Sequence, residues 1–283
     1  MRRVYLPTTL DELWSIMDGE PNAGIFAGGT DFLVKLRRGE IAVDGLICIE
    51  RLTEIQGVRE ERDEILVGAG TTHAELLESG VIHRHLPVLV QALQILASPP
   101  IRHMGTIGGN IVNASPAGDT LPPLYVLGAF LEIRSREKTR IVPIDQFISG
   151  PGQVQMSRQE VLTGIRIPKP KGFGIHHFEK IGRRKSQACA IASMAALVSL
   201  SPDGMVDDIR IAWGSVGPTV ATCEGAENIL RESPLRPEIL EQAASLVGKT
   251  VSPIADVRAG AEYRRVVAGN LLFRLMRYGC NGT

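Results

Sequence analysis

The stretch Ile25-Phe26-Ala27-Gly28-Gly29-Thr30-Asp31 decides how this chain is interpreted. Residues 24–26 form a short apolar run that predicts a strand, and residues 32–38 have helical spacing. The two glycines therefore lie between a strand and a helix. Adjacent glycines allow positive φ and the close approach of another group. Successive amides in such a turn form an anion-binding nest, and the following helix adds its positive end. A phosphate group is the expected ligand of this turn, and the Thr30 hydroxyl is a further hydrogen-bond donor.

A second glycine pair lies in Thr106-Ile107-Gly108-Gly109-Asn110, with Ser115 and Asp119 downstream. It has the same ingredients as the first, and we expect Asp119 to cap a helix that begins there. Two such cradles, that is, two turns whose backbone amides can bind an anion, predict a diphosphate held from both sides. A dinucleotide ligand fits this arrangement. Neither loop fits G-x-G-x-x-G or G-x-x-x-x-G-K-[ST], so neither a Rossmann site nor a P-loop is supported. Plain tight turns remain the alternative.

Around the first loop the pattern predicts β-α-β-α-β in miniature. The strands are expected at 4–6, 24–26 and 46–49, and the helices at 9–17 and 32–38. Thr8 followed by Asp11 resembles a capping box for the first helix. A second block is expected to contain strands at 65–68 and 161–167, helices at 72–78 and 86–97, and a hairpin of 130–135 with 140–143. Pro99-Pro100 is expected to end the longer helix.

The segment 168–172, Pro-Lys-Pro-Lys-Gly, is the best candidate boundary. Beyond it we expect three strands and then three helices, at 175–180, 190–200, 209–213, 223–231, 238–247 and 256–278. Strands followed by helices indicate an α+β layout. We expect an N-terminal domain over 1–170, with subdomains of about 1–57 and 58–170, and a C-terminal domain over 171–283.

Composition excludes several classes of protein. Lysine plus arginine and aspartate plus glutamate both count 31 in 283 residues, which argues against nucleic-acid binding. The N-terminus lacks the apolar core of a secretory signal, and no stretch is suited to span a bilayer. The four cysteines have no metal-type spacing and fit a reduced, cytoplasmic setting: Cys48, Cys189, Cys223 and Cys280. Adjacent His176 and His177 would point to opposite faces of a strand, which disfavours a metal site.

Five segments of the sequence resemble the FAD-binding medium subunits of molybdenum hydroxylases, the family of xanthine dehydrogenase and carbon monoxide dehydrogenase. The two most specific are AGGTDFLVKLRRGE at 27–40 and GTIGGNIVNASPAGDTLPPLYVLGA at 105–129. The others are LICIERLTEIQGV at 46–58, FISGPGQVQMSRQEVLTGIRIP at 147–168 and HHFEKIGRRKSQACAIASMAALVSL at 176–200. The likeness covers nearly the whole chain in order, and its glycine motif is closer to xanthine dehydrogenase members.

The resemblance implies a two-part FAD-binding domain followed by a three-stranded antiparallel sheet with a helical bundle. It implies that residues 27–31 wrap the FAD diphosphate, with Ile25 and Phe26 leading in. Further residues are implied to complete the site: Thr106, Ile107, Gly108, Gly109, Asn110, Ser115, Asp119, Leu162, Lys180 and Cys189. Of these, Asp119 would reach the nucleotide half, Leu162 and Lys180 would lie beside the flavin, and Cys189 would approach its ring.

The same resemblance implies an electron-transfer subunit. Molybdopterin would belong to a large partner subunit and two [2Fe-2S] clusters to a small one, with NAD as the usual acceptor. The substrate pocket would lie in another chain. The role of these subunits in the family implies no catalytic residue and no metal site in this chain. A stand-alone flavin reductase of the same broad fold and a non-catalytic nucleotide-binding assembly protein are the alternatives.

Three features depart from the family pattern or remain open. Cys189 stands where relatives often carry an aromatic or aliphatic residue, and we expect it to be a small buried hydrophobe without a redox role. Lys180 could equally be a surface lysine at the end of a strand. The arginines near the C-terminus are expected to form a solvated face rather than a docking site for an acidic partner: Arg258, Arg264, Arg265, Arg274 and Arg277.

Overall fold

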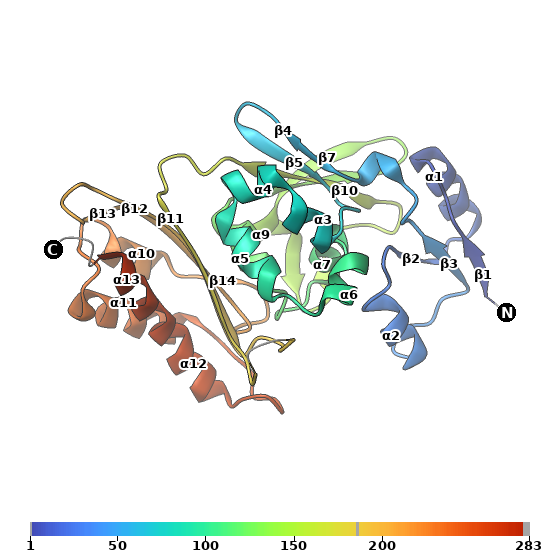
Figure 1. The fold of residues 1–283 in the computed structure, drawn as a ribbon. Helices are drawn as coiled ribbons and strands as arrows, with labels where there is room; N and C mark the ends of the chain where they lie inside the picture. The colour runs from blue at the N-terminus through green and yellow to red at the C-terminus, as the bar shows by residue number, and fades with distance from the viewer. Residues whose placement is uncertain (1, 185–186, 280–283) are drawn as a thin grey trace. The chain divides into compact units, whose positions relative to one another are not determined.

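The computed structural model describes residues 2–184 and 187–279, which form two compact units (Figure 1). Lys185, Ser186 and Cys280, which the sequence analysis quoted, lie outside these residues. The first unit contains 2–81, 98–114 and 129–168. The second contains 82–97, 115–128 and the described residues from 169 onward. Within the described residues, none of the helices combines the length and apolar character needed to cross a membrane.

The first unit begins with the predicted β-α-β-α-β arrangement. Its elements are β1 (Arg3–Tyr5), α1 (Leu10–Gly19), β2 (Gly24–Phe26), α2 (Phe32–Arg37) and β3 (Gly45–Cys48). The three strands are parallel in the order β1-β3-β2. Leu13 and Trp14 of α1 pack against Ile47 in an apolar core. The predicted cap of α1 is wrong by one residue, because the Thr9 hydroxyl accepts from the Glu12 amide while Thr8 donates to the Glu12 carboxylate.

A five-stranded antiparallel sheet completes the framework of this unit. Its order is β4 (Val58–Glu60), β5 (Glu64–Gly68), β10 (Val161–Pro168), β6 (Phe130–Arg134) and β7 (Thr139–Pro143). The predicted hairpin is therefore present as β6 and β7. The sequence missed β4, whose residues Arg59 and Glu60 are exposed and carry no apolar signal. Shorter elements follow the same chain: η1 (Thr53–Ile55), α9 (Ile144–Phe147), β8 (Ile148–Gly150) and β9 (Gln153–Val154).

Three short helices lie near the glycine motifs: α3 (His73–Glu78), α6 (Pro99–Met104) and α7 (Ile107–Asn113). Pro99 and Pro100 begin α6 rather than merely ending the helix before it, because proline is well suited to the first helical turn. The second glycine motif is likewise not an open loop. Gly108 and Gly109 lie in the first turn of α7, whose N-cap is Thr106. One further helix, α4 (Gly80–His85), follows α3.

The second unit is built on an antiparallel sheet of β11 (Ile175–Ile181), β12 (Ala192–Leu200), β13 (Val206–Gly214) and β14 (Ala221–Thr222). The three long strands were predicted, and the two-residue β14 was not. Helices cover both faces, with α5 packed against β11 and the C-terminal helices on the other side (Figure 1). The helices are α5 (Pro87–Ile95), α8 (Leu121–Val126), α10 (Glu224–Leu230), α11 (Pro237–Thr250), α12 (Ala261–Asn270), η2 (Leu271–Leu275) and α13 (Met276–Gly279).

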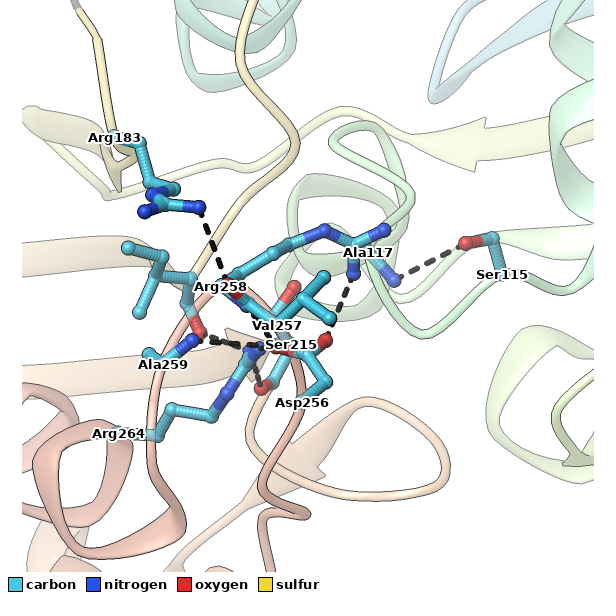
Figure 2. A network of polar contacts seen from close by, with 10 residues as sticks. Ser115, Ala117, Arg183, Ser215, Asp256, Val257, Arg258, Ala259 and Arg264 are labelled. Atoms are coloured by element: carbon cyan, nitrogen blue, oxygen red, sulfur yellow. Dashed lines mark hydrogen bonds and ion pairs between the residues drawn. The ribbon is translucent and has the colours of Figure 1, made fainter.

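Arg264 on α12 is the centre of a polar network in the second unit (Figure 2). It is buried and donates to the carbonyl oxygens of Ile191 and Ser215 at 2.6 and 3.0 Å. It also donates to the Asp256 carboxylate at 2.7 Å, and this carboxylate also accepts from Arg258 at 3.1 Å. The expectation of a solvated arginine face is therefore wrong for Arg264, which ties three segments of chain together.

Candidate FAD-binding site

The first glycine loop offers backbone donors to a ligand. It runs from the end of β2 to the start of α2, and Gly29 has φ +67°, a conformation that favours glycine. No hydrogen bond joins the amides of Gly28, Gly29 or Thr30 to another residue within 2–184 and 187–279. These three residues line a cavity together with Asp31, whose side chain does not cap α2. A row of unpartnered amides at a turn is the arrangement that binds an anion.

The second glycine motif differs from the first, because its amides already have acceptors. The Thr106 hydroxyl accepts from the Gly109 amide at 3.0 Å. The remaining bonds are Ile107 N to Thr71 O at 3.0 Å, Gly108 N to Ala69 O at 2.9 Å and Asn110 N to Thr106 O at 3.0 Å. The expectation of a second cradle of backbone amides is therefore wrong. This motif supplies a glycine surface and the side chains of α7.

The two motifs lie side by side within the first unit. A Cβ atom on Gly28 would overlap the backbone of Met104, directly before the second motif. A second link joins α2, which follows the first motif, to α7, which contains the second, since the Lys35 ammonium donates to the Asn113 side-chain oxygen at 2.6 Å. Contacts distant in sequence therefore hold the unpartnered amides against the second motif.

Two chambers that share lining residues lie beside these elements. The more polar one has a volume of about 290 Å³, and its lining includes residues 25–31, His73, Thr106, Gly109 and Asn110. The smaller, apolar one has a volume of about 160 Å³ and is lined by Ala69, Val112, Val161 and Leu162 among others. Ile25, Phe26, Ala27, Thr106 and Gly109 line both chambers. A more polar chamber next to an apolar one suits a phosphate-bearing ligand with an aromatic ring.

His73 is a site residue that the sequence did not single out. It is 3% exposed and lines the polar chamber. Its amide donates to Gly105 O at 3.0 Å, directly before the second motif. Burial, helped by the positive charge of Arg102, lowers the pKa of His73 to about 4, so the ring is neutral near pH 7. The only signal in the sequence that could have indicated its position is that it directly follows Thr71 and Thr72, which fold against the second glycine motif.

Four of the predicted site residues belong to the second unit. Asp119 and Lys180 form a buried ion pair of 2.6 Å, and Lys180 also donates to Ile95 O at 3.0 Å. Lys180 is thus no surface lysine. Burial raises the pKa of Asp119 to about 6, although Lys180 opposes the shift. Asp119 does not cap α8, whose N-cap is Thr120.

The other two are Ser115 and Cys189. The Ser115 hydroxyl accepts from the Ala117 amide at 3.3 Å (Figure 2). Cys189 is exposed, so the expectation of a small buried hydrophobe is wrong, while Cys48 and Cys223 are buried free thiols. In the described part of the chain, no three histidine, cysteine, aspartate or glutamate side chains gather as metal ligands.

The fold and the site together define a flavin-binding protein. Residues 1–170 match the FAD binding domain in molybdopterin dehydrogenase, and residues 176–278 match the CO dehydrogenase flavoprotein C-terminal domain. The chain belongs to the FAD-binding medium subunits of the molybdenum hydroxylases, which are subunits of oxidoreductase complexes.

Individual relatives show how close this likeness is. The chain is 34% identical over 259 residues to the xanthine dehydrogenase FAD-binding subunit of Escherichia coli O157:H7, covering 90% of this chain and 88% of that one. It is 30% identical over 256 residues to the carbon monoxide dehydrogenase medium chain of Hydrogenophaga pseudoflava, with coverage of 90% and 88%. A chain of reconstituted CO dehydrogenase from Oligotropha carboxidovorans superposes with a TM-score of 0.92 at 28% identity, covering 99% and 97%.

Proposed function

We propose that this chain is the electron-transfer flavin subunit of a multi-subunit molybdenum hydroxylase. When bound, FAD would supply the redox chemistry, accepting electrons from [2Fe-2S] clusters of a small partner subunit and delivering them as hydride to NAD⁺. The molybdopterin would belong to a large partner subunit. The work of this chain is to bind and orient the cofactor, and we assign none of its side chains a role as catalytic acid or base.

The observation that carries the proposal is the row of unpartnered amides at Gly28, Gly29 and Thr30. They would donate to the FAD diphosphate in the polar chamber. Gly109 lines both chambers, and a Cβ atom there would meet only the Thr106 hydroxyl, so the second motif offers a surface that a ligand can approach closely. Leu162 would pack against one of the cofactor's ring systems in the apolar chamber.

Further positions are proposed from the family resemblance alone. Asp119 and Lys180, as a fixed ion pair, would contact the cofactor, as would Ser115 and Cys189. The functional domains would be 1–170 and 171–283, with subdomains of about 1–57 and 58–170 in the first. The proposed complex is a heterotrimer or a dimer of heterotrimers that works in the cytoplasm.

The first test is the visible spectrum of the purified chain, with the released chromophore identified by mass. We expect close to one FAD per chain and no iron–sulfur absorbance. A tagged chain from the native source should also carry two further subunits, with iron and molybdenum. If neither the isolated chain nor the native complex holds FAD in this subunit, the proposal is wrong.

The acceptor needs a separate experiment. Anaerobic addition of NADH to the FAD-loaded chain should bleach the oxidised flavin spectrum, because hydride transfer is reversible. Reduced ferredoxin and a quinol are the matched comparisons under the same conditions. If NADH leaves the spectrum unchanged while one of the others bleaches it, FAD binding stands and the assignment of NAD is wrong.

A further inference from the structure

His73 is held in the cofactor chamber by a rigid backbone frame. It is the first residue of α3, directly after Thr72 in a complete capping box with Glu75. Its amide donates to Gly105 O, and Ile107 donates back to Thr71 O, both at 3.0 Å. The ring lies over Gly105, where an added Cβ would come within 3.3 Å of its Cδ2 atom. The imidazole therefore has a fixed place beside the second glycine motif.

The surroundings of the ring assign its two nitrogens different roles. Nδ1 is buried and has no hydrogen-bond partner among the described residues. Nε2 is the nitrogen that remains for the chamber which the ring lines. A neutral imidazole carries one N–H, and a buried N–H without an acceptor is rarer in proteins than a bare acceptor. The proton is therefore placed on Nε2, where a ligand atom can accept it.

Other groups of the chamber leave a place for such a donor. The Lys35 ammonium uses one of its three donors on Asn113 at 2.6 Å, and the Asp31 carboxylate accepts but cannot donate. Gly28, Gly29 and Thr30, whose amides have no partner among the described residues, line the same chamber. Since Gly28 lies against Met104 and His73 against Gly105, the amides and the imidazole flank consecutive residues of one segment.

We propose that the Nε2–H group of His73 donates a hydrogen bond to a diphosphate oxygen of FAD, beside the amides of the first glycine loop. This inference rests on the proposed binding of FAD and adds a positioning residue that acts through a neutral donor. A neutral imidazole can bind an anion through its N–H group without carrying a charge that changes near pH 7. The His73 ring stays neutral because burial and the charge of Arg102 keep its pKa at about 4. The other charged groups of the chamber are Asp31 and Lys35.

Three substitutions separate a donor from a packing role. His73→Leu keeps an apolar side chain and removes the donor. His73→Gln places an amide NH₂ near the position of Nε2, whereas His73→Asn places it near Nδ1. We expect His73→Leu and His73→Asn to weaken FAD binding to the apoprotein about 10- to 100-fold, since a hydrogen bond to a charged group is at stake, and His73→Gln to stay within a few-fold of wild type. Fluorescence titration measures the affinities.

A second readout reports the proposed contact itself. In ³¹P NMR of the FAD-loaded proteins, His73→Leu should shift at least one diphosphate resonance, and His73→Gln should restore it in part. Equal affinity of wild type and His73→Leu would overturn the proposal, as would equal loss in the Leu, Asn and Gln variants. If His73→Leu does not fold, the comparison of Gln with Asn decides. Failure of the wild type itself to bind FAD would instead refute the proposed function.

Discussion

The backbone carbonyl of Met104 occupies the space that a Cβ atom on Gly28 would need. Gly28 is therefore explained by packing between two backbone segments of the first unit, and not by the approach of a ligand. Gly108 has the same kind of role, because its Cβ would come within 2.6 Å of Ala69 O. Gly28 and Gly108 thus dock the two motifs onto the framework, while a Cβ atom on Gly109 would meet only the Thr106 hydroxyl beside the cavity.

Gly28→Ala should force the first loop away from Met104. Overpacking of a buried contact costs about 1–3 kcal/mol or more, and here the obstacle is backbone that cannot change rotamer. We expect a lower free energy of unfolding in urea and at least tenfold weaker FAD binding. The matched control is Gly19→Ala, where the added methyl would meet nothing within 4 Å. Equal stability and affinity of the two variants would contradict this account.

Gly108 and Gly109 should respond differently although they are adjacent. Gly108→Ala would collide with Ala69 and is expected to lower stability. The Cβ atom of Gly109→Val would meet only the Thr106 hydroxyl, at 2.9 Å, and we expect the branched side chain beyond it to obstruct both chambers. We therefore expect Gly109→Val to unfold close to the wild-type urea midpoint but to purify without FAD. Normal flavin content in Gly109→Val would remove this motif from the site.

Local signals in the sequence predicted most strands and the position of both glycine motifs. Period-two runs and turn residues are encoded within a few positions, as at residues 24–31. The unequal roles of the motifs were not predictable in this way, because the acceptors of the second motif come from Ala69 and Thr71, far earlier in the chain. The same limit applies to His73, whose burial depends on Gly105.

The exposure of Cys189 and the burial of Arg264 were also missed, for a related reason. Residue type gives a tendency to be buried, but the tertiary contacts decide it. Three acceptors, Ile191 O, Ser215 O and the Asp256 carboxylate, surround Arg264 inside the second unit and accept from the two terminal nitrogens of its guanidinium. Sequence spacing alone placed this arginine on an open helix face.

Arg264→Met should destabilise the second unit strongly. The methionine fills similar space but leaves the Ile191 and Ser215 carbonyls without their donor and Asp256 without one of its partners. Each buried polar group left unsatisfied costs about 1–3 kcal/mol. Arg265→Met on the same helix is the control, since Arg265 pairs at the surface with Glu262. The urea midpoint should fall for Arg264→Met and barely change for Arg265→Met; similar small changes would refute the anchoring role.

The ion pair of Asp119 and Lys180 predicts a coupled effect. Asp119→Asn leaves a buried ammonium without its counter-charge, and Lys180→Met leaves a buried carboxylate, so each should cost about 3–5 kcal/mol. The double variant removes both charges and should be more stable than the sum of the single effects implies. Urea denaturation of all four proteins measures the coupling. Additive losses would show that the two groups act independently.

Stability should fall on mild acidification because of two buried histidines. The folded-state pKa values of His73 and His177 are lowered by burial from 6.5 to about 4. Between these values the unfolded chain binds more protons, so the free energy of unfolding decreases as pH falls through 6.5. Asp119 acts in the opposite direction, because its pKa is raised from 3.8 to about 6 and its folded form gains a proton first.

When the pH falls from 7.5 to 5.5, each histidine should lower the free energy of unfolding by about 1 kcal/mol, and Asp119 should raise it by a smaller amount. His73→Gln and His177→Gln should each lose about this share of the pH dependence. Urea unfolding at both pH values gives the comparison. If His73→Gln retains the wild-type pH dependence, its imidazole is not held neutral in the folded chain, and the tautomer argued for its Nε2 atom loses its basis.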